Sequence, residues 1–279
     1  MKVLNFGSLN IDLVYRVHDF VRPGETIPAL SFARFAGGKG LNQSIALARA
    51  GAMVIHAGAV GAEGGFLLDA MRESGVDCSA VAVDREVPGG HAVIQVADSG
   101  ENSIVLYPGA NHRITDELID RAMKAAGPGD ILLLQNEISR IDVIMRRAAE
   151  HGLRIFFNPA PMTEEAAKYP LDVVDTLIVN ETEWEALFAC RPCLRCHVLK
   201  TLGAKGAIYD DGIFVPAQRV ENVVDTTAAG DTFIGYFIAE LIAGKDVESA
   251  MKTATSASAW CIQRAGAAPS IPRRSDLAE

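Results

Sequence analysis

The chain has 279 residues, of which 49% are hydrophobic, and its formal net charge is −9. This size and composition can bury the core of one α/β domain spanning residues 1–279. The acidic balance, with no long run of Lys or Arg, argues against partners such as nucleic acid or an anionic membrane surface and favours small-molecule ligands.

The first residues and the cysteines indicate the cellular compartment in which the protein is expected. Residues 1–7 reach polar positions before any apolar stretch long enough for a secretory signal, and no run of about 18 apolar residues follows. The 5 cysteines make an odd count without a disulfide framework. We therefore expect a cytoplasmic protein whose cysteines are thiols.

Short apolar runs alternate with helical patterns along the chain. This alternation is typical of a mainly parallel, Rossmann-like sheet covered by helices. The predicted strands are residues 3–6, 54–60, 131–134, 154–157, 176–179 and 198–202. Ligands of open α/β sheets bind at the carboxyl ends of the strands, so we expect polar residues near those ends to line one edge. These residues are Asn10, Gln135, Asn158, Asn180 and Thr201.

Two stretches, residues 11–36 and 90–107, depart from this rhythm. The first contains a Pro-Gly turn at positions 23–24, and the second alternates polar and apolar residues from His91 to Gln95. Both patterns predict antiparallel strands and turns. Because they flank the first βα units, we expect a small antiparallel β lid over the site.

The segment Gly37-Gly38-Lys39-Gly40 precedes a helical pattern that stops at Gly51. Paired glycines let a ligand approach the backbone, and Lys39 and Asn42 offer donors to hydroxyl groups. Taken alone, such a pair more often marks a plain turn. The segment lacks the Gly-Lys-Ser/Thr of a P-loop, and the chain has no Gly-x-Gly-x-x-Gly fingerprint, which argues against a dinucleotide-dependent dehydrogenase.

The segment Asn180-Glu181-Thr182-Glu183 follows a predicted strand. Asn180 and Glu183 could orient a hydrated Mg²⁺ ion and phosphates. The alternative is a helix-capping box that begins at Thr182, and the residues alone favour it.

The stretch from Val224 to Thr232 places three small residues, Ala228 to Gly230, directly before Asp231. Apolar residues at helical spacing predict a helix that begins near Asp231 and ends before Gly244. Uncovered N–H groups at such a helix start form an anion hole for phosphoryl oxygens. Asp231 could accept the proton of an attacking hydroxyl, or it could simply be the helix N-cap.

A cysteine-rich segment has the ligand density of a zinc site: Cys190, Cys193, Cys196 and His197. Its close spacing strains four ligands around one ion, and the usual second, distant pair is missing. Ordinary thiols are the expectation, and zinc is the alternative.

Several of these motifs, in this order, resemble the ribokinases of the PfkB-type carbohydrate kinases. They are Gly7 to Asp12, Gly37 to Asn42, Asn158 to Pro161, Asn180 to Glu183, Thr201 to Gly203 and Asp225 to Asp231. The resemblance runs from about residue 3 to Pro272. It implies a ribokinase-like α/β fold and transfer of the γ-phosphate of ATP to the 5-hydroxyl of D-ribose.

The resemblance also implies roles for individual residues. Asp231 is the expected catalytic base, and Ala228, Ala229 and Gly230 are the expected anion hole. The residues expected to hold the sugar are Asn10, Asp12, Gly38, Lys39, Asn42, Glu137 and Asp231. The residues expected near ATP are Asn180, Glu183, Thr201 and Gly203, with Glu183 acting on Mg²⁺ through water. A K⁺ ion is expected at Asp225, Thr227, Cys261, Arg264, Gly266 and Ser270.

The sugar set favours ribose over fructose or a nucleoside, because buried polar groups reject a ligand that leaves them unpaired. The alternatives are a related kinase acting on fructose, deoxyribose or a nucleoside, and a non-catalytic sugar sensor of the same fold. The resemblance further implies a homodimer built through the lid. Residues 188–197 are shorter than the usual family segment, so we expect a helix there to be missing or reduced to a loop.

Overall fold

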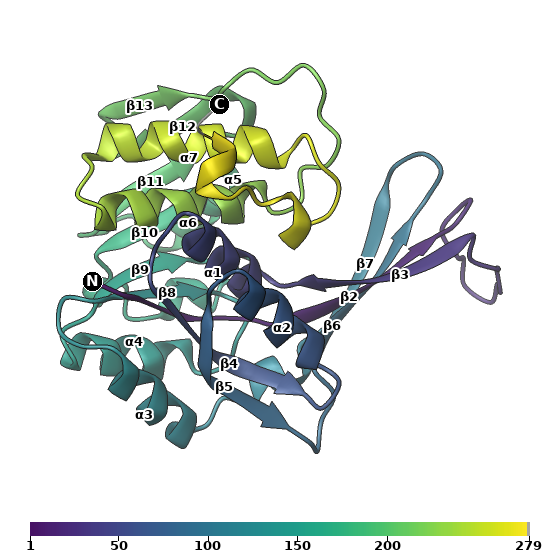
Figure 1. Cartoon of the computed structure of the whole chain (residues 1–279), viewed down its shortest axis with the longest axis horizontal. Helices are drawn as coiled ribbons and strands as arrows, with labels where there is room; N and C mark the ends of the chain where they lie inside the picture. The colour runs from purple at the N-terminus through teal and green to yellow at the C-terminus, as the bar shows by residue number, and fades with distance from the viewer. Residues whose placement is uncertain (278–279) are drawn as a thin grey trace.

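The structure, a computed structural model, describes residues 1–277 and contains a nine-stranded and a four-stranded sheet (Figure 1). The strands of the large sheet, in spatial order, are β13 (Ile213–Pro216), β12 (Gly206–Tyr209), β11 (His197–Thr201), β10 (Thr176–Asn180), β9 (Arg154–Asn158), β8 (Ile131–Gln135), β1 (Val3–Phe6), β4 (Val54–Gly61) and β5 (Asp77–Asp84). All pairings from β11 to β5 are parallel, and β12 and β13 add an antiparallel edge.

Continuous apolar runs form the centre of this sheet. Strands β1, β4 and β8 are buried along their whole length, as expected for parallel strands covered on both faces. The predicted strands agree with the structure to within a residue or two at each end. The predicted fold class is confirmed.

The helices cover the two faces of the large sheet and share two apolar cores. They are α1 (Lys39–Arg49), α2 (Gly65–Glu73), α3 (Asp116–Ala125), α4 (Ile141–Glu150), α5 (Glu181–Cys190), α6 (Ala229–Ile242) and α7 (Val247–Cys261). Short 3₁₀ turns lie at Gly109–His112, Ala166–Lys168, Leu171–Val173, Gly203–Lys205, Ala268–Ser270 and Arg274–Leu277. Helices α1, α2, α6 and α7 contribute to one core, and α3, α4 and α5 to the other. In residues 1–277, no helix is long and apolar enough to cross a membrane.

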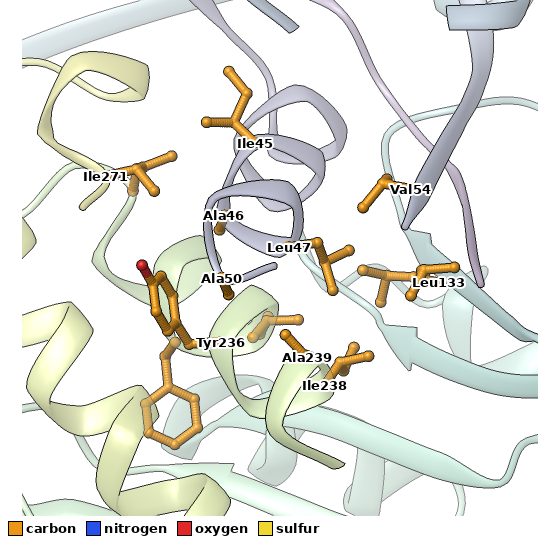
Figure 2. Close-up of a cluster of buried hydrophobic side chains, with 14 of the residues drawn as sticks. Ile45, Ala46, Leu47, Ala50, Val54, Leu133, Tyr236, Ile238, Ala239 and Ile271 are labelled. Atoms are coloured by element: carbon orange, nitrogen blue, oxygen red, sulfur yellow. The ribbon is translucent and has the colours of Figure 1, made fainter. Parts of the chain in front are cut away.

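Helices α1 and α6 pack closely in the first core (Figure 2). A Cβ atom at Gly235 would stand 2.4 Å from the Cβ atom of Ala46 and 2.8 Å from the backbone nitrogen of Leu47. Next to this contact, the buried Tyr236 donates a hydrogen bond to the Pro272 carbonyl at 2.9 Å. Gly235 therefore sets the distance between the two helices that carry most of the site.

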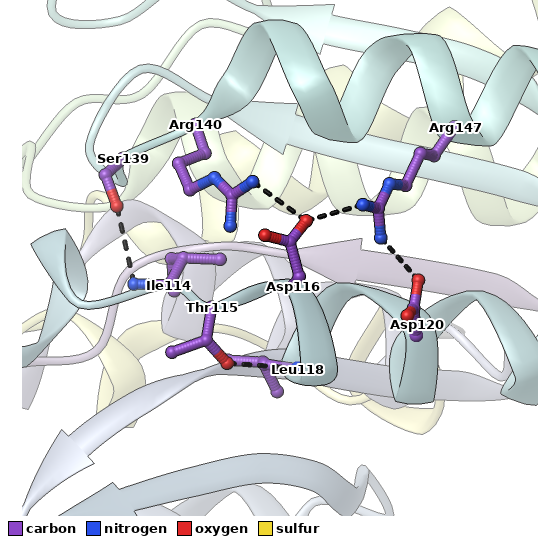
Figure 3. A network of polar contacts seen from close by, with 8 residues as sticks. All are labelled: Ile114, Thr115, Asp116, Leu118, Asp120, Ser139, Arg140 and Arg147. Atoms are coloured by element: carbon purple, nitrogen blue, oxygen red, sulfur yellow. Dashed lines mark hydrogen bonds and ion pairs between the residues drawn. The ribbon is translucent and has the colours of Figure 1, made fainter.

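An ion-pair network joins α3 and α4 on the other face (Figure 3). Arg140 donates to Asp116 at 2.9 Å, and Arg147 contacts both Asp116 and Asp120. Thr115 caps α3 by accepting from the Leu118 N–H at 3.2 Å. Single exposed pairs contribute little, but a shared carboxylate with two guanidinium partners holds the helix ends together.

The smaller sheet projects from the large one (Figure 1) and consists of β3 (Ser31–Gly37), β2 (Asn10–Arg16), β6 (Gly90–Val96) and β7 (Asn102–Tyr107). The prediction of lid strands in 11–36 and 90–107 agrees with these strands. One pairing differs from the prediction, because β2 and β6 run parallel while the outer pairs are antiparallel. The long connection from β2 through the main sheet to β6 permits this arrangement.

The shortened segment also agrees with its prediction. Helix α5 ends at Cys190, and residues 191–196 form a loop without a helix before β11. Helix α6 begins at Ala229, two positions before the predicted start.

The close contact at Gly235 predicts that Gly235→Ala lowers the free energy of unfolding by about 1–3 kcal/mol, because the added methyl overpacks the contact between α1 and α6. Urea unfolding followed by circular dichroism measures this change. The matched control is Gly65→Ala, since Gly65 is exposed in α2 and its Cβ would meet no atom within 4 Å. Equal free energies of unfolding for the two variants would show that α1 and α6 can move apart to fit the methyl group without loss of stability.

Candidate active site

The site begins where the turn after β1 meets the start of α1. Gly40 lies so close to this turn that a Cβ atom would be 2.4 Å from the Ser8 nitrogen and 2.6 Å from the Gly7 Cα. Gly38 before it has a φ of 94°, a left-handed backbone that favours glycine. The glycine segment thus brings α1 against the turn that leads into the lid, which a general turn signal alone does not predict.

Glu137 and Asp12 form an acidic group beside this turn. The Glu137 carboxylate accepts hydrogen bonds from the Ser8 hydroxyl and, at 3.1 Å, from the Lys39 N–H. Burial raises the pKa of Glu137, although the Lys39 charge opposes this effect. Burial and the nearby Glu137 charge raise the pKa of Asp12 to about 6. Asp12 lies directly beside Gly37, where a Cβ atom would meet its carboxylate at 2.1 Å.

Asn10 at the start of β2 is held in one orientation by Asn111. The Asn111 Nδ2 donates to the Asn10 Oδ1 at 2.7 Å, and the Asn111 Oδ1 accepts from the Leu9 N–H at 3.0 Å. Both side chains are buried. The bond fixes the Asn10 amide with its oxygen toward Asn111.

Asp231 lies in the first turn of α6 and is 9% exposed. One carboxylate oxygen accepts from the Asn42 Nδ2 at 3.0 Å, and the other accepts from the Gln43 Nε2 at 2.9 Å. The N-cap alternative is wrong, because the cap position is Ala228, in a left-handed conformation with φ 60°. Asp231 therefore faces the donors of α1 rather than its own helix end.

Lys39 is the basic group among these carboxylates. The Asp231 charge raises the pKa of the Lys39 ammonium most strongly, and the charges of Glu137 and Glu183 raise it further. Burial lowers it, but the three acidic groups outweigh that effect. Lys39 thus remains a cation between the acidic group and Asp231.

The start of α6 next to Asp231 offers backbone N–H donors, but the N–H group of Ala229, one of the expected residues, is already bonded. The Ala229 N–H donates to the Thr226 carbonyl at 3.2 Å. The first N–H groups of a helix have no acceptor within it, so the N–H groups of Gly230 and Asp231 are the better anion-hole donors. No side chain crowds Gly230, since a Cβ there would meet no atom within 4 Å.

Two adjoining hollows meet at this helix start. The first, of about 230 Å³, is lined by Lys39, Asp231, Asn158 and Glu183 among others. The second, of about 600 Å³, has a largely apolar wall that includes Gly203, Val223, Phe233 and Ala259. Asn180, Thr201, Thr226 and Gly230 line both hollows. Of the expected sugar residues, Lys39 and Asp231 line the first hollow, which also holds most of the expected nucleotide residues, whereas Gly203 lines the second.

Asn180 and Glu183 form a capping box at the start of α5. The Glu183 N–H donates to the Asn180 Oδ1 at 2.8 Å, and the Asn180 N–H donates to the Glu183 Oε2 at 2.9 Å. The prediction of a capping box that begins at Thr182 is wrong by two positions, because the N-cap residue is Asn180. The cap leaves one Glu183 oxygen for other partners and orients both side chains at the first hollow.

The expected cation residues come from two segments, residues 225–227 before α6 and residues 261–270 from the end of α7 onward, which meet in one loop region. The Asp225 carboxylate accepts from the Thr227 N–H at 2.9 Å, the Thr227 hydroxyl at 2.6 Å and the Gly266 N–H at 2.9 Å. Burial acts to raise the pKa of Asp225, but these hydrogen bonds outweigh it and lower the pKa. The carboxylate therefore fixes the loop on both sides.

Cys261 and Ser270 complete this loop. The Cys261 Sγ lies 3.6 Å from the Thr227 carbonyl oxygen and 3.0 Å from the Ser270 hydroxyl. Burial raises the pKa of the Cys261 thiol. The Arg264 guanidinium stacks 3.7 Å from the centre of the Trp260 ring, so only the Arg264 backbone can belong to an ion site in this arrangement.

The cysteine-rich segment does not gather into a metal centre. Cys190 and Cys193 are exposed, and His197 pairs with Asp210 at 2.6 Å. Within residues 1–277, no three His, Cys, Asp or Glu side chains are grouped to hold a metal ion. The zinc alternative has no support in this part of the chain.

Comparison with known proteins places the chain in a family. Residues 1–274 match the domain described as pfkB family carbohydrate kinase. The chain belongs to the pfkB family of carbohydrate kinases. It is 33% identical to the ribokinase of Haemophilus influenzae, over 98% of this chain and 96% of that protein. It is 34% identical to the ribokinase of Bacillus subtilis, over 98% of this chain and 97% of that protein.

Solved structures agree with this family. A Cryptococcus neoformans ribokinase in complex with ADP has a TM-score of 0.87 and 33% identity, covering 99% of this chain and 98% of that chain. An Arabidopsis thaliana ribokinase complexed with ribose and ATP has a TM-score of 0.87 and 29% identity, covering 99% and 97%. The resemblance inferred from the motifs is confirmed.

Some residues of this pfkB-family site were not singled out from the sequence. Ser8 lies inside one recognised motif and Gln43 directly follows another, but only the structure shows that they bond Glu137 and Asp231. Asn111 lies in the 3₁₀ turn after the lid strand β7 and carries no motif. A polar residue at the point where a lid strand re-enters the body was the one available signal.

The raised pKa of Asp12 predicts a pH dependence of stability. Between about pH 4 and pH 6 the folded protein keeps the Asp12 proton, whereas the unfolded chain releases it, so the free energy of unfolding falls as pH rises. The loss is about 3 kcal/mol at most. Asp12→Asn removes this slope, and urea unfolding from pH 4 to pH 7 measures it. The control is Asp19→Asn at an exposed position, which should keep the wild-type slope. A wild-type slope in Asp12→Asn would refute the assignment of this pH dependence to Asp12.

Proposed function

We propose that this chain is a ribokinase, which transfers the γ-phosphate of ATP to the 5-hydroxyl of D-ribose and yields ribose 5-phosphate and ADP. The observation that carries the proposal is the buried Asp231 carboxylate, held by two amides between a polar pocket and an open helix N-terminus. Relatives of nearly equal length are ribokinases, and one solved relative holds ribose and ATP.

The polar pocket is suited to a small polyol. Beside this pocket, Asp12 and Glu137 supply acceptors, while Lys39, the Gly38 backbone and the NH₂ group of Asn10, whose oxygen is bonded by Asn111, supply donors. The Asn42 Oδ1 is buried and has no partner within the described chain. A sugar hydroxyl would donate to this oxygen and relieve the cost of leaving it unpaired.

The transfer step needs a base and an anion hole at one point. The Asp231 carboxylate accepts the proton of the sugar hydroxyl as the oxygen forms its bond to the γ-phosphorus and the bond to ADP breaks. The N–H groups of Gly230 and Asp231, with Ala228 and Ala229 small enough to leave them open, stabilise the phosphoryl oxygens. Lys39 adds positive charge on the same side.

The nucleotide fits the larger hollow on the other side of α6. Its apolar wall suits a purine, Gly203 lines it, and Asn180 and Thr201 lie where it joins the first hollow. The capped Glu183 keeps an oxygen available, and we assign it to a water of Mg²⁺, with no direct coordination needed. Mg²⁺ bound there would neutralise charge on the transferred phosphate.

Deoxyribose is the second candidate substrate. A deoxyribokinase of Salmonella typhi is 31% identical over 98% of this chain, close to the identity of the ribokinases. Asn10, Asp12 and Glu137 together favour ribose, because a deoxy sugar would leave one of these buried groups unpaired. Nucleoside kinases from Methanocaldococcus jannaschii and Burkholderia thailandensis, at 17% and 21% identity, share the fold alone.

The experiment that tests the function measures ADP release from ATP and Mg²⁺ with ribose, 2-deoxyribose, fructose and nucleosides, and identifies the product by mass. We expect ribose to give the highest kcat/KM. A higher value for 2-deoxyribose would move the assignment to that sugar. Sugar binding without ADP release for every substrate would favour the sensor alternative.

Asp231→Asn should lower kcat by roughly 10³-fold or more, because a positioned base and its charge are lost while the shape is kept. Ribose binding measured by calorimetry should change little, since the sugar pocket retains its other groups. The matched control is Asp246→Asn, because Asp246 only caps α7 on the surface. Wild-type turnover in Asp231→Asn would refute the assigned base.

The loop at Asp225 is suited to a monovalent cation. Thr227 supplies a carbonyl oxygen, Ser270 a hydroxyl and Asp225 a carboxylate. The Cys261 thiol contacts both the Thr227 carbonyl and the Ser270 hydroxyl, so these two oxygens lie near each other. Hard oxygen donors of this kind, with the Cys261, Arg264 and Gly266 carbonyls nearby in sequence, suit K⁺ better than a soft metal. Bound there, K⁺ would stabilise the loop that leads into the anion hole.

If K⁺ occupies this loop, replacing K⁺ by tetramethylammonium should lower kcat several-fold, because the larger ion cannot enter a compact oxygen site. In Asp225→Asn, the rates in the two salts should become equal at the lower value. Steady-state assays at constant ionic strength measure this difference. Equal wild-type rates in both salts would remove K⁺ from the mechanism.

We extend the proposal to the lid and the assembly. The two sheets act as one unit of residues 1–279, with the smaller sheet as a lid over the sugar. Exposed apolar side chains on the lid, Phe32, Ile104 and Leu106, support a homodimer formed through these strands. The free thiols of Cys78 and Cys261 suit a cytoplasmic location.

A further inference from the structure

A continuous chain of buried polar side chains runs through the large sheet and ends at Asp231. Its members come from β1, α1, β4, β8 and β9, and each is at most 6% exposed. They are Asn5, Gln43, Ser44, His56, Gln135 and Asn158. Burying this many polar groups costs free energy unless each bond is made, so their arrangement needs an explanation.

The series of hydrogen-bonded side chains begins at the Asp231 carboxylate. The Gln43 Nε2 donates to Asp231 at 2.9 Å and lies 3.2 Å from the Asn158 Oδ1. The Gln135 Nε2 donates to the Gln43 Oε1 at 2.6 Å and to the Asn5 Oδ1 at 2.9 Å. Gln43 therefore touches Asp231 with its nitrogen and Gln135 with its oxygen.

The same series of hydrogen bonds then continues from Asn5 to the backbone carbonyl of Gly7. The Asn5 Nδ2 donates to the Ser44 hydroxyl and to the Gly40 carbonyl, both at 2.8 Å. The Ser44 hydroxyl lies 2.8 Å from the His56 Nδ1, and the His56 Nε2 lies 3.2 Å from the Gly7 carbonyl oxygen. Because a carbonyl only accepts, the Nε2 carries the proton and the Nδ1 accepts from Ser44.

The two ends fix the direction of every amide between them. An ionised carboxylate only accepts, so Gln43 must present its NH₂ group to Asp231 and its oxygen to Gln135. Asn158 is fixed in the same way, because its Nδ2 donates to the Ile178 carbonyl at 2.9 Å. Burial lowers the pKa of His56 to about 4, so the far end stays neutral as the chain requires.

We infer that Gln43 is a positioning residue, which holds the Asp231 carboxylate in its productive orientation, and that Gln135 fixes Gln43 for this task. Asn42 bonds one oxygen of Asp231, and Gln43 bonds the other. Without Gln43, the carboxylate is free to rotate about its side-chain bonds and to leave the hydroxyl it must deprotonate. The inference rests on the proposed function of Asp231 as the base.

The test is Gln43→Met, which keeps the length and volume of the side chain but removes its donors. We expect kcat to fall on the order of 10²-fold, since a small displacement of a reacting group has this effect. The KM values for sugar and ATP should stay within about threefold, because a loss confined to kcat marks an interaction of the transition state.

Two further variants separate positioning from stability. Gln135→Met should lower kcat by roughly tenfold with unchanged KM, because Gln43 is then less well oriented. Ser44→Ala also breaks the buried chain and should lower the melting temperature by about 2–6 °C. It should keep kcat within about twofold, because Asn5 still donates to Gly40 and remains linked to Asp231 through Gln135 and Gln43.

The outcomes can be told apart. If Gln43→Met lowers kcat no more than Ser44→Ala does, or changes KM with kcat retained, Gln43 is a structural residue and the inference fails. All variants are assayed with the wild type and Asp231→Asn, using whichever sugar the wild type phosphorylates. An active Asp231→Asn would overturn the assigned base itself, whereas an inactive Asp231→Asn beside a fully active Gln43→Met would overturn only the role of Gln43.

Discussion

The constraint on which the candidate site depends is the contact between α1 and the turn after β1. At Gly40 the backbones are so near that a methyl group would stand 2.4 Å from the Ser8 nitrogen. The opposite side of α1 meets α6 at Gly235 with equal closeness. Helix α1 is therefore fixed from both sides, and it carries Lys39, Asn42 and Gln43 to the Asp231 carboxylate. The site depends on small residues far from one another in sequence.

Charge separates the two halves of the site. On the side proposed for the sugar, the partly buried Asp12 and Glu137 form an acidic group in which Lys39 is the cation. Such a group suits neutral hydroxyls and repels phosphate, because like charges in a partly buried pocket interact strongly. On the other side, the start of α6 presents N–H groups and its positive dipole end. In the proposed function, a polyol and a phosphate bind on opposite sides of Asp231, and the reacting atoms meet between them.

The sequence predicted the architecture well, because its signals are local. Continuous apolar runs such as residues 131–134 mark buried parallel strands, and the small residues before Asp231 mark a helix start. Contacts across the fold carry no such signal. Gln43 and Asp231 are 188 positions apart, and nothing in either segment says that an amide of one will meet the carboxylate of the other. The parallel pairing of β2 with β6 was missed for the same reason, since strand direction there depends on a long crossover.

The shortened segment 191–196 leads into β11 at His197, and Thr201 lies at the other end of that strand, where the pairing of the sheet holds it. Strand β11 pairs with β10 from Thr176–His197 to Asn180–Thr201, so Thr201 is held opposite Asn180 by the sheet itself. The hairpin of β12 and β13 then covers the outer edge of β11. Gly206 closes this corner, since a Cβ atom there would lie 2.1 Å from the Val215 carbonyl oxygen. Thr201 and Gly203 thus keep their places because backbone pairing on both sides fixes the strand that leads to them.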